Sequence, residues 1–123
     1  MISMKRLFVT LVAALALFPS AVSAASVQLI PDKLALRGHE IGKITIRYLG
    51  GGLHDPISAN SGTCTGVTVR PTSLVHARRF GRNNEWELMQ NFSVSGVPAP
   101  GPRSCKVEFK AGSLRAEAPV TIQ

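Results

Sequence analysis

Residues 103–109 read RSCKVEF and alternate between two kinds of side chain. In an extended chain, Cys105, Val107 and Phe109 fall on one face, and the polar residues between them fall on the other. Such alternation predicts a half-buried β-strand. A segment rich in proline and glycine precedes the strand, and we expect the strand to lie in the middle of a sheet.

Alternation of this kind recurs at intervals of about ten residues, separated by Gly/Pro turns, and no later stretch has the period of an amphipathic helix. The expected strands are 26–30, 34–36, 43–48, 64–70, 73–79, 85–95, 103–109 and 114–122. The pattern predicts an all-β sandwich of seven or eight antiparallel strands, forming one domain over residues 25–123. Trp86 and Phe92 are expected in its core.

Residues 49–63 are expected to form a long loop, because they include Gly50, Gly51, Gly52 and Pro56. Three consecutive glycines could cradle a phosphate group. The Lys-Ser/Thr pair of a phosphate-binding loop does not follow them, so we interpret them as a flexible connection.

The first residues have the composition of a secretory signal peptide. Lys5 and Arg6 precede an apolar run at 7–18, and residues 22–24 fit the small-x-small rule for cleavage. The apolar run is shorter than the roughly 20 residues that a helix needs to cross a bilayer. We therefore interpret 1–24 as a signal peptide and predict a periplasmic or secreted protein without a membrane span after cleavage.

The chain has two cysteines, Cys64 and Cys105. Paired cysteines of exported proteins form disulfides, and the absence of Cys-x-x-Cys spacing argues against a redox or metal site. A Cys64–Cys105 bridge would close a loop of about 41 residues and stabilise the fold by roughly 4 kcal/mol. Strict alternation with Val67 puts Cys64 on the wrong face. Either a β-bulge at Gly66 restores the phase, or Cys64 lies at the end of the preceding loop.

The segment VQLIPDKLAL at 27–36 is followed by GKITIRY at 42–48. This sequence of a strand, a proline kink, a short strand and a long alternating strand resembles the opening of bacterial immunoglobulin-like domains. Residues 92–109 resemble the E-to-F connection of the same group. The resemblance implies an immunoglobulin-like sandwich with a binding, adhesion or assembly role, and it assigns no functional residue. The chain departs from antibody-type domains in two ways: its cysteines are closer in the sequence than the usual inter-sheet pair, and no Trp follows Cys64 closely. By strand order Cys64 falls on the third or fourth strand, so the bridge could join neighbouring strands of one sheet.

No combination of side chains predicts catalysis, a metal site or a cofactor. The three histidines, His39, His54 and His76, have no second ligand at i+2 or i+4. There is no Gly-x-Ser-x-Gly motif. Glu85 and Glu87 are two residues apart beside a group of arginines, and we interpret them as charge partners of those arginines rather than as a glycosidase pair. We therefore predict that the protein is not an enzyme.

The strongest candidate for a binding site is a basic turn at 78–84. It brings together three guanidinium groups and one aromatic ring, those of Arg78, Arg79, Arg82 and Phe80. Guanidinium groups bind carboxylate and phosphate groups through two hydrogen bonds. The turn suits an acidic protein, an anionic polysaccharide or another envelope component, whereas export makes nucleic acid a poor candidate. The alternative is a solvated hairpin tip whose charge prevents aggregation.

These features predict an exported binding or assembly module of the periplasm or cell surface. It would act through an exposed strand edge or through the basic 78–82 turn. The alternative is a protein inhibitor that inserts loop 49–63 or 78–84 into the cleft of a hydrolase. A rigid, protruding loop would favour inhibition, and an unpaired strand edge would favour assembly.

Overall fold

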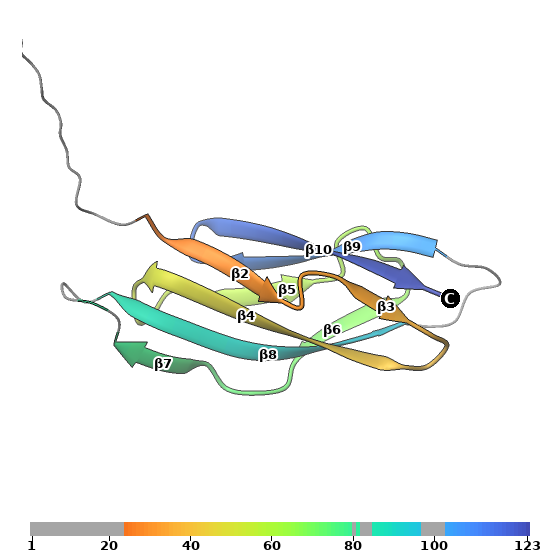
Figure 1. Cartoon of the computed structure of the whole chain (residues 1–123), viewed down its shortest axis with the longest axis horizontal. Coiled ribbons are helices and arrows are strands. Elements are labelled where there is room, and N and C mark those ends of the chain that lie inside the picture. The colour runs from red at the N-terminus through yellow and green to blue at the C-terminus, as the bar shows by residue number, and fades with distance from the viewer. Residues whose placement is uncertain (1–23, 80, 82–84, 97–102) are drawn as a thin grey trace, which may run out of the picture.

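The computed structural model describes residues 24–79, 81, 85–96 and 103–123. The predicted signal peptide lies outside this part of the chain, apart from Ala24, as do Phe80 and Arg82 of the predicted basic turn. The described residues form β-strands and no helix, so none of them belongs to a helix that could span a bilayer. The prediction of an all-β fold is confirmed (Figure 1).

One sheet has four strands, in the order β3 (Leu34–Leu36), β10 (Leu114–Ile122), β9 (Arg103–Ala111) and β5 (Ile57–Asn60). β9 pairs with β10 on one side and β5 on the other, so its predicted central position is confirmed. β3 runs parallel to β10, with Leu34 opposite Val120. The expectation of antiparallel pairing throughout is therefore wrong. The chain passes from β2 (Ser26–Ile30) into β3 without reversing its direction (Figure 1), and it meets β10 as a parallel neighbour.

The other sheet has five strands, in the order β2 (Ser26–Ile30), β4 (Ile41–Gly51) and β8 (Trp86–Gly96), followed by β6 (Val67–Pro71) and β7 (His76–Arg79), which both pair with β8. β4 and β8 pair along almost their whole length, from Ile41 opposite Ser95 to Gly51 opposite Trp86. β6 lines the C-terminal half of β8, and β7 lines the N-terminal half. The described part of the chain thus has nine strands, not seven or eight.

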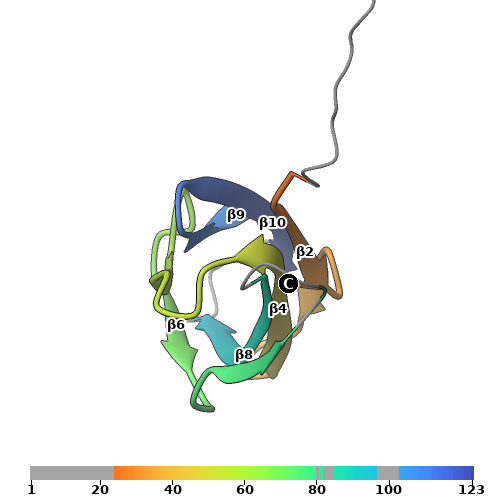
Figure 2. The same cartoon turned by 90° about the vertical axis from the view of Figure 1, so that its left-hand side faces the viewer.

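The two sheets face each other and enclose one apolar core (Figure 2). The largest fully buried side chains alternate along β4, β8, β9 and β10, as the sequence predicted: Ile44, Ile46, Leu88, Val94, Val107, Phe109, Val120 and Ile122. Phe92 of β8 meets Phe109 of β9 edge to face, with ring centroids 5.4 Å apart. Trp86 is only half-buried, so its expected place in the core is wrong. As the first residue of β8, it packs at the margin of the core.

The predicted disulfide between Cys64 and Cys105 is present, with a Cα–Cα distance of 5.0 Å. Cys105 belongs to β9, whereas Cys64 precedes the first residue of β6, Val67. The expectation that a strand begins at Cys64 is wrong, and so is the bulge at Gly66. The alternative, that Cys64 lies at the end of a loop, is confirmed. The bridge therefore ties the β5–β6 connection to the four-stranded sheet.

Backbone contacts explain why this connection lies against β9. Thr63 N donates a hydrogen bond to the carbonyl oxygen of Lys106 (2.9 Å), and Lys106 N donates one to Thr63 Oγ1 (2.9 Å). Gly62 has a φ of +56°, and a Cβ atom at this position would collide with the Lys106 carbonyl oxygen. Glycine thus allows the close approach that presents Cys64 to Cys105.

The prediction of a long loop at residues 49–63 is wrong. Its first three residues extend β4 to Gly51, and Ile57–Asn60 form β5 at the edge of the four-stranded sheet. Only a short turn around Asp55 separates the two strands, held by a hydrogen bond from Asp55 N to the Gly52 carbonyl oxygen (3.1 Å).

Candidate functional site

The two arginines of the basic turn that the structure describes, Arg78 and Arg79, belong to β7. All four residues of β7 are exposed. Arg78 lies opposite Glu87 of β8, and Arg79 lies opposite Trp86. Because side chains alternate along a strand, the two arginines point to opposite faces of the sheet. The sequence predicted that these arginines come together in one turn. In the structure the two do not form one continuous patch.

Glu87 lies between two arginines on the outer face of the five-stranded sheet. Its Oε2 is 2.7 Å from Nε of Arg47 in β4, and its Oε1 is 2.8 Å from a terminal guanidinium nitrogen of Arg78. Glu87 is 5% exposed, although it lies on the outward face. The hydrogen bond from Arg47 and the charges of both arginines outweigh burial, so the pKa of Glu87 is lowered. Both carboxylate oxygens are therefore occupied by arginine.

This arrangement confirms the interpretation of Glu87 as a charge partner of the arginines. The sequence did not identify Arg47, which comes from another strand. Arg47 also donates a hydrogen bond to Gln28 of β2 (3.5 Å). The Arg47 side chain is thus held between Gln28 and Glu87, whereas the side chain of Arg78 is 72% exposed and free to turn its remaining donors to solvent.

Arg79 covers the indole ring of Trp86 on the other side of β7. Its guanidinium carbon lies 5.5 Å from the ring centroid, within the range of a cation–π contact. Trp86 is the chain's only tryptophan. Its fluorescence therefore reports on this edge of the sandwich alone.

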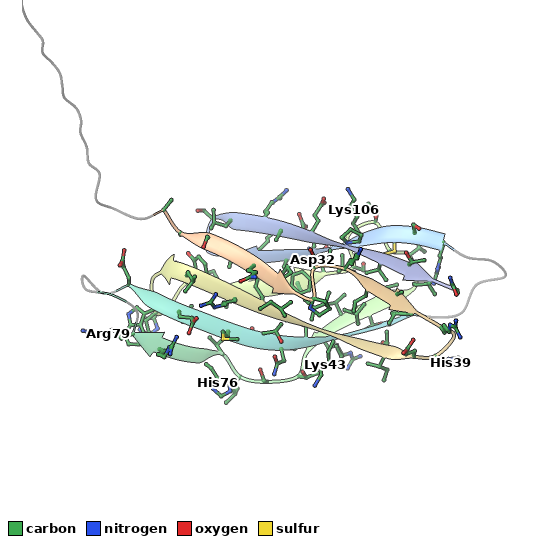
Figure 3. The ribbon with its side chains drawn as sticks, in the orientation of Figure 1. Asp32, His39, Lys43, His76, Arg79 and Lys106 are labelled. Carbon is green, nitrogen blue, oxygen red and sulfur yellow. A yellow bond between two sulfur atoms is a disulfide. The ribbon has the colours of Figure 1, made fainter. Side chains whose placement is uncertain are left out.

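The outer side chains of the five-stranded sheet form what we call the basic face, which carries Lys43, Arg47, Arg70, Arg78 and one carboxylate, Glu87. Lys43 of β4 and Arg70 of β6 lie opposite the same residue of β8, Ser93. Both are exposed, and neither makes an ion pair within the described residues. Figure 3 shows Lys43 and His76 on this side of the molecule and Lys106 on the opposite side.

The outer side chains of the four-stranded sheet form a mixed-charge face, with Lys106, Lys110, Arg115, Glu108 and Glu117. Arg115 pairs with Glu108 at 3.4 Å, and Lys106 pairs with Glu117 at 3.9 Å. An open depression of about 480 Å³ on this face is lined by Glu108, Arg115, Ala116 and Glu117. Its charged groups already bind one another, so it offers little to a charged ligand.

Two glycines of the run that was predicted to be a flexible connection, Gly51 and Gly52, pack closely against Tyr48 and Asp55. Tyr48 donates a hydrogen bond to Asp55 Oδ2 (2.7 Å), and Gly52 N donates another to the same oxygen (3.0 Å). A side chain at Gly51 would overlap the Tyr48 ring. Burial, followed by the hydrogen bond and charge of Asp55, raises the pKa of Tyr48 to about 12. The hydrogen bond from Tyr48 lowers the pKa of Asp55.

The histidines do not come together. His39 lies in the turn after β3, His54 in the turn before β5, and His76 in β7, and Figure 3 shows His39 and His76 far apart. Among the residues that the structure describes, no group of three His, Cys, Asp or Glu side chains could hold a metal ion.

No model of a known protein family matches this chain, and no curated protein matches it. The candidate site is therefore defined by its geometry. Three of its cations, Lys43, Arg47 and Arg70, were not singled out from the sequence. Their outward positions follow from strand alternation, but their grouping depends on which strands are neighbours.

Proposed function

We propose that this chain is an exported, non-enzymatic binding module with an immunoglobulin-like fold, acting at the periplasm or cell surface through β7. The strand order supports the fold assignment. The order β2-β4-β8-β6 corresponds to strands A, B, E and D of a constant-type immunoglobulin domain, and β5-β9-β10 corresponds to C, F and G.

The observation that carries the proposal is the exposure of β7. It pairs with β8 on one side, and within the described residues no strand pairs with its other side. An extended segment of a partner can add to such an edge through backbone hydrogen bonds. Arg78 and Arg79 belong to the same strand, so each face of the sheet carries one guanidinium group beside this edge. Acidic groups of a partner would meet the guanidinium groups beside that edge.

The alternative of a loop-inserting inhibitor receives no support from residues 49–63. β5 occupies the middle of this segment, and the remaining turn is fastened by the hydrogen bond between Tyr48 and Asp55. A short, internally bonded turn does not offer the protruding loop that insertion into a cleft requires.

The test is capture of a partner from a periplasmic or secreted extract with the mature protein and two triple variants. One variant is R78A/R79A/R82A. The other, K106A/K110A/R115A, removes the same number of charges from the mixed-charge face. We expect the wild type and the second variant to recover the same partner, and the first variant to lose it. Equal recovery by all three would overturn a role for β7, provided that thermal unfolding shows all three to be folded.

A further inference from the structure

The basic face has a regular arrangement that the β7 edge alone does not use. The outward side chains of β8 include Asn91, Ser93 and Ser95, which are small, uncharged and partly exposed. Cations follow the neighbouring strands on both sides of this row. Lys43 and Arg47 project from β4, and Arg70 and Arg78 project from β6 and β7.

Strand geometry gives the spacing of these cations. Neighbouring strands lie about 4.8 Å apart, so the backbones of the two cationic lines are about 10 Å apart with β8 between them. Along β4, Lys43 and Arg47 are four residues apart, which corresponds to about 13 Å. The result is two groups of cations on either side of β8: Lys43 and Arg70, both opposite Ser93, and Arg47 and Arg78, opposite Met89 and Glu87.

We propose that this face binds a linear anionic polysaccharide lying along β8. This inference rests on the proposed binding function and names its ligand class. A chain of acidic or sulfated sugars carries negative charges at regular intervals, which would meet the two cation pairs in turn. Its hydroxyl groups would meet Ser93 and Ser95. Asn91 accepts a hydrogen bond from Thr45 at Oδ1 (2.6 Å). Its side-chain nitrogen, Nδ2, makes no hydrogen bond within the described residues and can donate to the sugar.

Glu87 prepares one of the cation pairs. Its two oxygens hold Arg47 and Arg78 on either side of β8, which fixes their separation before a ligand arrives. The other pair, Lys43 and Arg70, has no carboxylate partner in the described part of the chain. The unneutralised pair should therefore contribute most of the electrostatic attraction.

The apolar side chains argue against a membrane surface as the ligand. The exposed aliphatic residues of the strands and connections around this face are Ile30, Ile41, Leu74 and Val75, at 45%, 65%, 85% and 43% exposure. Ile30 comes from β2, Ile41 from the start of β4, and the adjacent Leu74 and Val75 from the β6–β7 connection. These three positions lie on different strands or connections, and two adjacent side chains are less than the apolar face that an interfacial anchor buries.

The centre of the strip argues against two other classes of partner. Protein interfaces are enriched in aromatic residues at their centre, and single-stranded nucleic acids stack their bases on outward aromatic rings. The outward side chains of β8 between Glu87 and Ser95 include no aromatic residue, and Trp86 lies opposite Arg79 under a cation–π contact. A polar, hydroxyl-rich ligand fits this surface better.

The test compares K43A/R70A with K106A/K110A, which removes two charges from the opposite face. Both sites are exposed or half-exposed, so neither double variant should disturb the fold. The probes are dextran sulfate, polygalacturonate and neutral dextran, with calorimetry as the readout. We expect the wild type and K106A/K110A to bind at least one of the two anionic polymers and not neutral dextran. K43A/R70A should bind that polymer at least about tenfold more weakly, because charge-assisted contacts are lost.

Further arms use vesicles of anionic phospholipid, a polyglutamate peptide and single-stranded DNA. Binding to one of these, without binding to either anionic polysaccharide, would overturn the inference. So would an equal loss of polysaccharide binding in the two double variants, since net charge would then explain it. If β7-dependent capture of a partner succeeds while polysaccharide binding fails, the inference is wrong and the proposed function stands. If the capture fails as well, both are overturned.

Discussion

The outer faces of the two sheets differ in how many of their cations are paired with carboxylates. The basic face has four cations and one carboxylate, from Lys43, Arg47, Arg70, Arg78 and Glu87. The mixed-charge face has three cations and two carboxylates, from Lys106, Lys110, Arg115, Glu108 and Glu117. On the mixed-charge face both carboxylates pair with local cations, whereas on the basic face a single carboxylate is shared by two arginines.

The comparison shows that the positive charge of the chain, +7 in total, is unevenly distributed between the two faces. Surface ion pairs contribute little to stability, but their carboxylates offset the positive charge of the face that carries them. The mixed-charge face resembles an ordinary solvated surface for this reason. The basic face keeps unneutralised cations at fixed positions, which favours an anionic ligand.

The largest expected effect concerns the covalent link on the four-stranded side. Replacing both cysteines, C64A/C105A, should lower the free energy of unfolding by about 4 kcal/mol, because the unfolded chain regains its loop entropy. Urea denaturation measures this loss. Hydrogen exchange should show faster opening of β5 and its connection to β6, while β4 and β8 remain protected by their long mutual pairing.

Two observations would contradict that prediction. Intact mass of the exported protein, with and without reductant, should differ by the two hydrogen atoms of the reduced cysteines, and the mass should match residues 25–123. Two free thiols in the exported protein would refute the bridge in the cell. Equal acceleration of exchange in both sheets would show that the link stabilises the whole sandwich and not its four-stranded side.

The next effect tests how closely the connection approaches β9. Gly62 and Gly38 have nearly the same φ, +56° and +54°. A Cβ atom at Gly62 would collide with the Lys106 carbonyl oxygen, whereas nothing lies within 4 Å of one at Gly38. Gly38→Ala should cost about 1 kcal/mol for the left-handed backbone. Gly62→Ala should cost about 2–4 kcal/mol, because overpacking adds to that strain. Equal urea midpoints for the two variants would rule out the close approach.

The strands that alternate over many residues could be predicted from the sequence. Residues 103–109 and 43–48 lie within β9 and β4, with the predicted residues facing inward. β5 was missed because Ile57–Asn60 lies among glycine, proline and serine and is too short to show a period. Its strand conformation depends on pairing with β9, and Asn60 donates a hydrogen bond to Glu108, 48 positions further along the chain.

The candidate site, too, could be predicted only in part from the sequence. Arg78 and Arg79 were found because they are adjacent in the sequence, and Glu87 was matched to arginine because it is close in the chain. The role of Arg47 depends on the register that places Leu49 opposite Glu87. No local pattern fixes that register. The placement of Lys43 and Arg70 on either side of β8 also depends on strand register.

A smaller effect concerns the contact between the sheets at Tyr48 of β4 and Asp55, which precedes β5. Tyr48→Phe should lower the free energy of unfolding by about 1 kcal/mol through loss of the hydrogen bond. Because the pKa of Tyr48 is raised to about 12, its stabilisation is complete below the ordinary tyrosine pKa and is lost as pH rises through the folded value. The lowered pKa of Asp55 acts in the opposite direction, so its contribution is present above the ordinary aspartate pKa and disappears in acid.

Tyr48 is the only tyrosine, so the tyrosinate absorbance of the folded protein reports this group alone. Its midpoint should lie near pH 12 and should fall to the ordinary tyrosine value in urea. In the Asp55→Asn variant it should fall only part of the way, because burial, the largest cause of the raised pKa, remains. An unshifted midpoint in the folded wild type would show that the hydroxyl is exposed and the contact absent.

The smallest effect on stability compares the two faces directly, through Glu87→Gln and Glu108→Gln. The pKa of each carboxyl is lowered, chiefly by a hydrogen bond from Arg47 to Glu87 and from Asn60 to Glu108. Their stabilisation is therefore present above the ordinary glutamate pKa and lost as pH falls. Glu87→Gln should flatten the acid limb of a stability–pH curve more, because Glu87 is buried between two arginines.

The same two substitutions separate the faces by their effect on binding. Each removes one negative charge from the protein, but only Glu87→Gln removes it from the basic face. Because Glu87 holds Arg47 and Arg78 on either side of β8, Glu87→Gln should weaken binding of the anionic polysaccharide although it removes a negative charge. Glu108→Gln should leave binding unchanged, since the charge it removes lies on the opposite side of the sandwich and screening limits its reach to about 10 Å. Equal changes in affinity from both substitutions would mean that the ligand responds to total charge, and the distinction between the two faces would then have no part in recognition.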